Sequence, residues 1–143
     1  PTTLLDSITR FRVLDLLAER LNERDLALVF ISHNLAELAR IVDRVLIMFG
    51  GRIVERAPVS ILKSGDRDLH PYTRELLNAV TLRHDTRRVQ PAVQQVNTGG
   101  CPFYHRCPEK DKLNVEQQRR CRDQRPAFFK HSTDHQIACW LWE

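Results

Sequence analysis

The sequence has no long hydrophobic run. Its longest uninterrupted apolar stretches are about as long as a β-strand, whereas a membrane-spanning helix needs roughly 20 apolar residues. We therefore expect no bilayer-crossing segment within these residues.

Glycine is also scarce, and the five glycines never form the phosphate-binding pattern G-x-x-x-x-G-K-[ST]. Phosphate binding by such a loop is therefore excluded within residues 1–143. Disulfide bonds, which form in oxidising compartments, are excluded within the first 100 residues, because all four cysteines lie in the last 43.

An excess of one charge sign is absent as well. Residues 1–100 carry 14 basic and 12 acidic side chains, and residues 101–143 carry 8 and 6. Because no basic arm exists, nucleic acid is not an expected partner. The apolar share of 42% and the charged share of 28% are typical of a globular protein.

The most informative stretch is residues 26–31, Leu-Ala-Leu-Val-Phe-Ile. Six consecutive apolar residues predict a strand covered on both faces, the pattern of a parallel sheet in an α/β fold. His33 follows at the carboxyl end of this strand, where open α/β sheets bind their ligands. Asn34 is a good N-cap, with Glu37 placed to close a capping box. His33 is therefore expected beside a helix N-terminus, in a position suited to phosphate.

The remaining pattern predicts several short elements. Apolar spacing and capping residues predict helices at residues 7–24, 35–42 and 58–63, and from Pro71 onward. A strand at 45–49, the dipeptide Gly50-Gly51 and a returning strand at 53–54 predict a β-hairpin. Residues 81–100 lack a sustained period and are expected to form a linker.

Residues 26–56 resemble the histidine-switch region of ABC-transporter ATPases, in the branch that imports dipeptides, oligopeptides and nickel. The matching segments are Ile31-Ser32-His33-Asn34-Leu35, Asp43-Arg44-Val45 and Gly50-Gly51-Arg52-Ile53-Val54-Glu55. Asn34 stands where the family usually has Asp, and both residues cap helices well. His70-Pro71-Tyr72-Thr73 resembles a stretch at the end of the family's ATPase core.

This resemblance implies a fold and a domain order. Residues 1–80 would be the C-terminal half of a P-loop (RecA-like) ABC ATPase domain, 81–100 a linker, and 101–143 a cysteine-rich, irregular extension. The implied function is that of an ATP-binding and ATP-hydrolysing subunit of a bacterial importer that energises peptide uptake. The sequence begins Pro1-Thr2-Thr3 and contains no phosphate loop. We therefore expect a C-terminal portion that does not hydrolyse ATP alone.

The same resemblance implies roles for two residues. His33 would contact the γ-phosphate and help hold the attacking water, and Asp6 matches the D-loop aspartate at the ATPase dimer interface. The intact subunit would bind ATP and Mg²⁺ at the cytoplasmic face of the inner membrane. Its partners would be a second ATPase subunit, transmembrane permease subunits and, indirectly, an extracytoplasmic peptide-binding protein.

The four cysteines are Cys101, Cys107, Cys121 and Cys139, separated by five, thirteen and seventeen residues. Structural zinc sites usually pair their ligands as C-x2–4-C, a closer spacing than this one. A [4Fe–4S] cluster also takes four thiolates and tolerates irregular spacing. The spacing of the cysteines by itself is compatible with either a zinc site or an iron–sulfur cluster, and disulfide bonds are a third possible interpretation.

Residues 100–108, 121–122 and 135–139 resemble the C-terminal extension of peptide-import ATPases, which in some members holds a [4Fe–4S] cluster on four cysteines. The resemblance therefore implies a cluster on all four cysteines, with Zn²⁺ as the alternative. His105, His131 and His135 are further candidate ligands. A function from another class is a stand-alone iron–sulfur or zinc-binding interaction module without ATPase activity.

Overall fold

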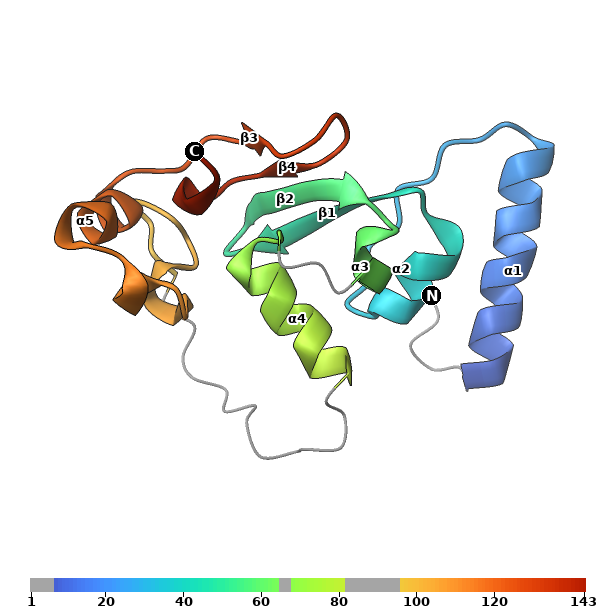
Figure 1. Cartoon of the computed structure of the whole chain (residues 1–143). Coiled ribbons are helices and arrows are strands. Elements are labelled where there is room, and N and C mark those ends of the chain that lie inside the picture. Colours follow the sequence, from blue (N-terminus) through green and yellow to red (C-terminus); the bar gives the residue numbers. More distant parts are fainter. Residues whose placement is uncertain (1–6, 65–67, 82–95) are drawn as a thin grey trace.

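The computed structural model describes residues 7–64, 68–81 and 96–143 (Figure 1). Its helices are α1 (Ser7–Glu23), α2 (Leu35–Ile41), α3 (Ile61–Ser64), α4 (Pro71–Thr81) and α5 (Val115–Asp123). Its strands are β1 (Arg44–Phe49), β2 (Arg52–Pro58), β3 (Phe129–Lys130) and β4 (Gln136–Ile137). Three 3₁₀ turns complete it: η1 (Tyr104–Arg106), η2 (Lys110–Lys112) and η3 (Trp140–Trp142). None of the helices described is long and apolar enough to span a membrane.

The predicted hairpin is confirmed. Gly50 and Gly51 have φ values of +56° and +74°, the left-handed conformation that a tight two-residue hairpin turn demands. Side chains of β1 alternate between buried and exposed, so Val45, Ile47 and Phe49 enter the core. The hairpin therefore provides one apolar face for the rest of the chain to cover.

Residues near the C-terminus complete the sheet that this hairpin begins. β4 pairs with β2, and β3 pairs with β4, so the strand order is β1-β2-β4-β3 and every pairing is antiparallel. One hydrophobic cluster joins the hairpin to residues beyond position 100. Its centre is an aromatic group in which Phe49 lies edge-on to Tyr72 and Phe103, with ring centroids 4.7 and 5.1 Å away.

The strand predicted at residues 26–31 is wrong for this structure. These residues form an irregular segment between α1 and α2, and Val29 and Ile31 are 91% and 93% exposed. A strand buried on both faces needs a hydrogen-bonded neighbour on each side. No described strand pairs with this segment, so its backbone has no ladder to join. The sheet is consequently antiparallel, although the mixture of helices and sheet is consistent with a C-terminal ABC ATPase region.

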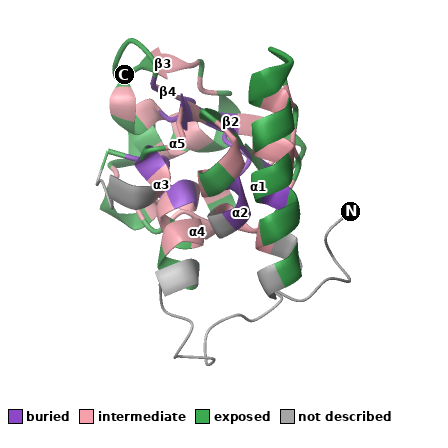
Figure 2. Ribbon diagram, turned by 90° about the vertical axis from the view of Figure 1, so that its right-hand side faces the viewer, coloured by how far each residue is buried: buried purple, intermediate pink, exposed green. Residues whose placement is uncertain are grey.

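The first two helices form as the apolar spacing predicts. Leu14 is buried on the inner face of α1, whose outer face is exposed (Figure 2). Arg40 on α2 binds the Asp15 carboxylate of α1 at 2.6 and 2.8 Å and lies over the Phe11 ring. These contacts hold the two helices together, and the expected apolar stripe of α1 is confirmed where its side chains are described.

Candidate functional site

His33 lies in the irregular segment just before α2, and its side chain is exposed. The neighbouring residues are ordered by the buried carboxylate of Glu37. That carboxylate accepts hydrogen bonds from the Ser32 hydroxyl at 2.9 Å and from the Asn34 side-chain amide at 3.1 Å. The arrangement joins Asn34 and Glu37, the pair predicted to form a capping box, through a hydrogen bond between their side chains, while the Asn34 backbone N–H binds the Ser32 hydroxyl at 3.0 Å. It leaves His33 facing solvent at the N-terminal end of α2.

The second residue assigned from the ATPase resemblance is Asp6, which falls outside the described residues. The structure also does not bring His33 to the cysteines. His33 precedes α2, whereas α5, which carries Cys121, lies at the other end of the sheet (Figure 1). The two predicted sites are therefore separate features of the molecule.

All four cysteines line a single cavity. They come from segments separated by as many as 38 residues, and all four thiols are free. The remaining walls include His70, Phe103 and Trp140. The cavity has a volume of about 20 Å³, the space of roughly one water molecule. The fold therefore collects the four thiols that the sequence scatters over its last 43 residues.

Three of these cysteines share one local geometry. Cys101, Cys107 and Cys139 each precede a 3₁₀ turn, and each accepts at its backbone carbonyl the N–H group three residues later, at 3.1, 3.3 and 3.1 Å. The following backbone N–H groups also point at the sulfurs. Those of Phe103 and Tyr104 hydrogen-bond to Cys101 and act to lower its pKa. Equivalent groups serve Cys107 and Cys139. These donors favour the thiolate form, which is the form that binds metals.

Burial acts in the opposite direction and dominates. Burial, with smaller contributions from the neighbouring thiols Cys107 and Cys121, raises the pKa of Cys101 to about 12. The pKa values of Cys107, Cys121 and Cys139 are also raised, chiefly by burial. The thiols of the metal-free chain are therefore protonated at neutral pH. A bound cation would have to displace these protons.

Within the described parts of the chain, no three His, Cys, Asp or Glu side chains are grouped so that they could hold a metal ion. The histidines considered as further ligands do not line the cysteine cavity. His105 is exposed. His131 lies 3.7 Å from Asp68, and His135 is bound to Glu55.

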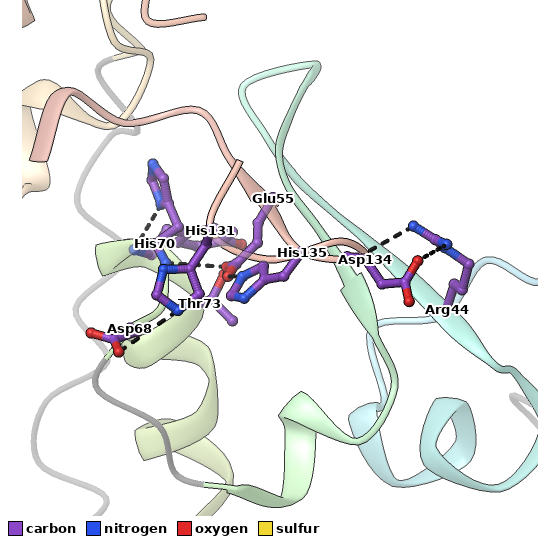
Figure 3. Close-up of polar contacts among 9 residues, drawn as sticks. Arg44, Glu55, Asp68, His70, Thr73, His131, Asp134 and His135 are labelled. Atoms are coloured by element: carbon purple, nitrogen blue, oxygen red, sulfur yellow. Dashed lines mark hydrogen bonds and ion pairs between the residues drawn. The ribbon is translucent and has the colours of Figure 1, made fainter. Parts of the chain in front are cut away.

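Beside the cavity, a buried carboxylate joins three elements. Glu55 on β2 is fully buried and accepts hydrogen bonds from the Thr73 hydroxyl on α4 and from the His70 backbone N–H at 3.2 Å. The His135 ring, just before β4, lies 2.6 Å from the same carboxylate (Figure 3). Arg44 binds Asp134 from the far side of this loop. Glu55 therefore ties the hairpin, α4 and the C-terminal strand together.

His70 is the N-cap residue of α4. Its carbonyl accepts the Arg74 N–H at 3.1 Å and its Nδ1 atom accepts the Tyr72 N–H at 3.1 Å, while Pro71 has no N–H to satisfy. Burial lowers the pKa of His70 to about 3, with a smaller contribution from Arg74, so the ring is neutral. Its Nε2 atom is buried and has no hydrogen-bond partner among the described residues.

Sequence reasoning missed the role of Glu55. It follows Val54 in a strand whose other buried residues are apolar. Nothing in the sequence spacing predicts that it contacts His70, Thr73 and His135, which are 15, 18 and 80 positions away. The sequence also gives no direct sign that His70 lies at the wall of the cysteine cavity. The signal that could have located it is Pro71, because proline at the first helical position makes the preceding residue the N-cap.

Comparison with known proteins defines the class. Residues 54–112 match the family described as the C-terminal region of the oligopeptide/dipeptide transporter. This match includes Glu55, His70, Cys101 and Cys107. Relatives at 34% identity over nearly the whole chain show that it belongs to the family of peptide ABC transporter ATP-binding proteins, as the histidine-switch resemblance predicted.

Particular relatives cover nearly all of the chain. A probable peptide ABC transporter ATP-binding protein of Sinorhizobium fredii is 34% identical over 98% of the chain and 41% of its own length. A di/tripeptide transport ATP-binding protein of Pseudomonas aeruginosa is 34% identical over 97% of the chain and 42% of its own length. A dipeptide transport ATP-binding protein of Caldanaerobacter subterraneus is 29% identical over 100% of the chain and 43% of its own length. The chain thus spans about two-fifths of the length of these curated relatives.

Substitution of Gly100 tests how tightly the cysteine segments are packed. A Cβ atom at Gly100 would overlap the backbone carbonyls of Cys121 and Arg122, whereas one at Gly99 would meet its nearest neighbour at 3.6 Å. We expect Gly100→Ala to lower the free energy of unfolding by about 1–3 kcal/mol and to speed labelling of the cysteines by a thiol reagent. Gly99→Ala is the matched control. Equal effects of the two substitutions on urea unfolding would contradict this packing.

Substitution of Glu55 tests its role as a shared acceptor. We expect Glu55→Gln to lower the free energy of unfolding by about 2–4 kcal/mol, because a buried amide would replace a carboxylate that receives several donors. Glu75→Gln is the control, since the Glu75–Arg106 pair is partly exposed and such pairs contribute about 0–1 kcal/mol. Urea denaturation of both variants makes the comparison, and a Glu55→Gln effect no larger than that of the control would contradict the role.

Proposed function

We propose that the chain is the C-terminal part of an ATP-binding, ATP-hydrolysing subunit of a bacterial peptide importer. The observation that carries this proposal is the alignment of nearly the whole chain with ATP-binding proteins of peptide transporters. The aligned part makes up only about two-fifths of the length of each of these relatives. Residues 26–31 support it, because they have the composition of a buried strand, yet Leu26, Val29 and Ile31 are exposed and no described strand pairs with them.

In this proposal His33 acts on the γ-phosphate of ATP. Its exposed position before α2 leaves the imidazole free to meet a nucleotide, and a ring nitrogen can hold the attacking water by hydrogen bonding. Mg²⁺ and the phosphate loop would come with the rest of the ATPase domain, and Asp6 would lie at the contact with a second ATPase subunit. The subunit would work at the cytoplasmic face of the inner membrane, on permease subunits that receive peptide from a binding protein.

We further propose that Cys101, Cys107, Cys121 and Cys139 hold a [4Fe–4S] cluster. Their lining of one cavity supports this ligand set, and so do the backbone N–H groups that face three of the sulfurs. Zinc needs all its ligands to converge on one atom, whereas a cluster takes one thiolate at each of four irons. The cluster would cross-link the C-terminal segments. The cavity of about 20 Å³ would have to widen when it is loaded.

ATP hydrolysis tests the first proposal. In the complete subunit, we expect His33→Ala to lower kcat by about 10²–10³-fold, because one positioned hydrogen bond to the reacting groups is lost. Glu116→Gln, an exposed change on α5, is the control and should leave kcat unchanged. Residues 1–143 alone should show no turnover. Turnover by these residues that His33→Ala abolishes would contradict the proposal, as would an upstream coding sequence without a phosphate loop.

Metal analysis tests the second proposal. The anaerobically purified chain should contain about four irons and four sulfides and absorb visible light, and Cys121→Ser should lose both. Arg119→Ala changes an exposed residue of the same helix and should keep the cluster. One zinc without iron would replace the cluster with a zinc site. The absence of both metals from the wild-type chain would overturn the assignment of the cysteines.

A further inference from the structure

The Nε2 atom of His70 is a buried polar atom that the fold leaves unused. The other polar groups of this residue are engaged: its backbone N–H binds Glu55, its carbonyl accepts the Arg74 N–H, and Nδ1 accepts the Tyr72 N–H. Among the buried side-chain nitrogens and oxygens that the structure describes, Nε2 alone lacks a hydrogen-bond partner. A buried polar group without a hydrogen-bond partner costs free energy. We therefore expect a bound ligand to supply an acceptor for Nε2.

The hydrogen bond at Nδ1 decides what Nε2 can do. A backbone N–H can only donate, so Nδ1 must be the unprotonated nitrogen and the proton of the neutral ring lies on Nε2. The ring points away from the Glu55 carboxylate in Figure 3. His70 thus presents a fixed, neutral N–H donor, held in place by the cap of α4.

His70 belongs to the wall of the cysteine cavity. His70 lines the cavity that is also lined by all four cysteines, and its ring is 5.9 Å from that of Phe103, another residue of the cavity wall. We propose that the His70 Nε2–H group donates a hydrogen bond to a thiolate sulfur of the loaded cysteine site. This inference rests on the proposed cluster, and it assigns to His70 a positioning and tuning role that is distinct from that of a ligand.

An N–H donor beside a thiolate has a defined electrostatic effect. It stabilises negative charge on the sulfur, so it favours the more negatively charged, reduced form of the bound group and raises its reduction potential. A residue that only filled space would leave the potential unchanged. The potential therefore separates the two roles of His70.

Two variants divide the functions of the ring. In His70→Asn the short side-chain oxygen can still accept the Tyr72 N–H, as Asn does at N-caps, but no donor reaches the cavity. In His70→Gln the longer amide places a donor near the position of Nε2. We expect both variants to retain about four irons per chain. We expect the equilibrium constant for one-electron reduction to fall about tenfold in His70→Asn, a shift of about 59 mV to more negative potential, and to stay closer to the wild-type value in His70→Gln.

The measurements are a mediated dithionite titration of the anaerobic chain and proton hyperfine spectroscopy of its reduced form. The reduced wild-type chain should show a coupled proton that exchanges in D₂O and that is absent in His70→Asn. An iron-loaded His70→Asn chain with the wild-type potential and the same exchangeable coupling would overturn the hydrogen bond while leaving the cluster intact. Equal loss of iron from both variants would make His70 a packing residue. A wild-type chain without iron would instead overturn the proposed cluster.

Discussion

The C-terminal half of the described structure depends on one buried carboxylate. Glu55 lies in β2, and its oxygens accept hydrogen bonds from His70 and Thr73 at the start of α4 and contact His135 beside β4. A buried carboxylate is costly unless its oxygens are satisfied, so this arrangement permits few alternatives. It fixes where α4 begins and how the C-terminal strand meets the hairpin, and it thereby positions His70 at the wall of the cysteine cavity.

The cysteine cavity shows how local turns and distant packing combine. Each of Cys101, Cys107 and Cys139 begins a 3₁₀ turn that directs backbone N–H groups toward its own sulfur, which is a property of a few consecutive residues. Bringing these turns to Cys121 requires long-range contacts. One is the hydrogen bond from the Cys101 N–H to the Cys121 carbonyl at 2.8 Å, and another is the close approach that Gly100 permits. Burial then holds the free thiols in their protonated form.

The histidine segment has a different physical character. Glu37 orders Ser32 and Asn34, while Val29 and Ile31 before them are almost fully exposed. Such exposure of Val29 and Ile31 is unusual for branched apolar side chains, and in the function proposed above the rest of the ATPase domain would cover them. The proposed nucleotide chemistry of His33 therefore depends on residues beyond those described.

The sequence by itself determined the elements whose cause is local. The Gly50-Gly51 turn, the helix that starts at Pro71 and the amphipathic α1 all follow from positive φ, a fixed φ or a helical period. Tertiary structure decided the rest. The apolar run at 26–31 was predicted as a strand, but strand formation needs a neighbour that periodicity cannot supply. Likewise, the β2–β4 pairing, the acceptor role of Glu55 and the common cavity of four cysteines join residues far apart in the chain. Short-range sequence patterns do not predict such contacts, because these contacts form only when loops close and the whole core packs together.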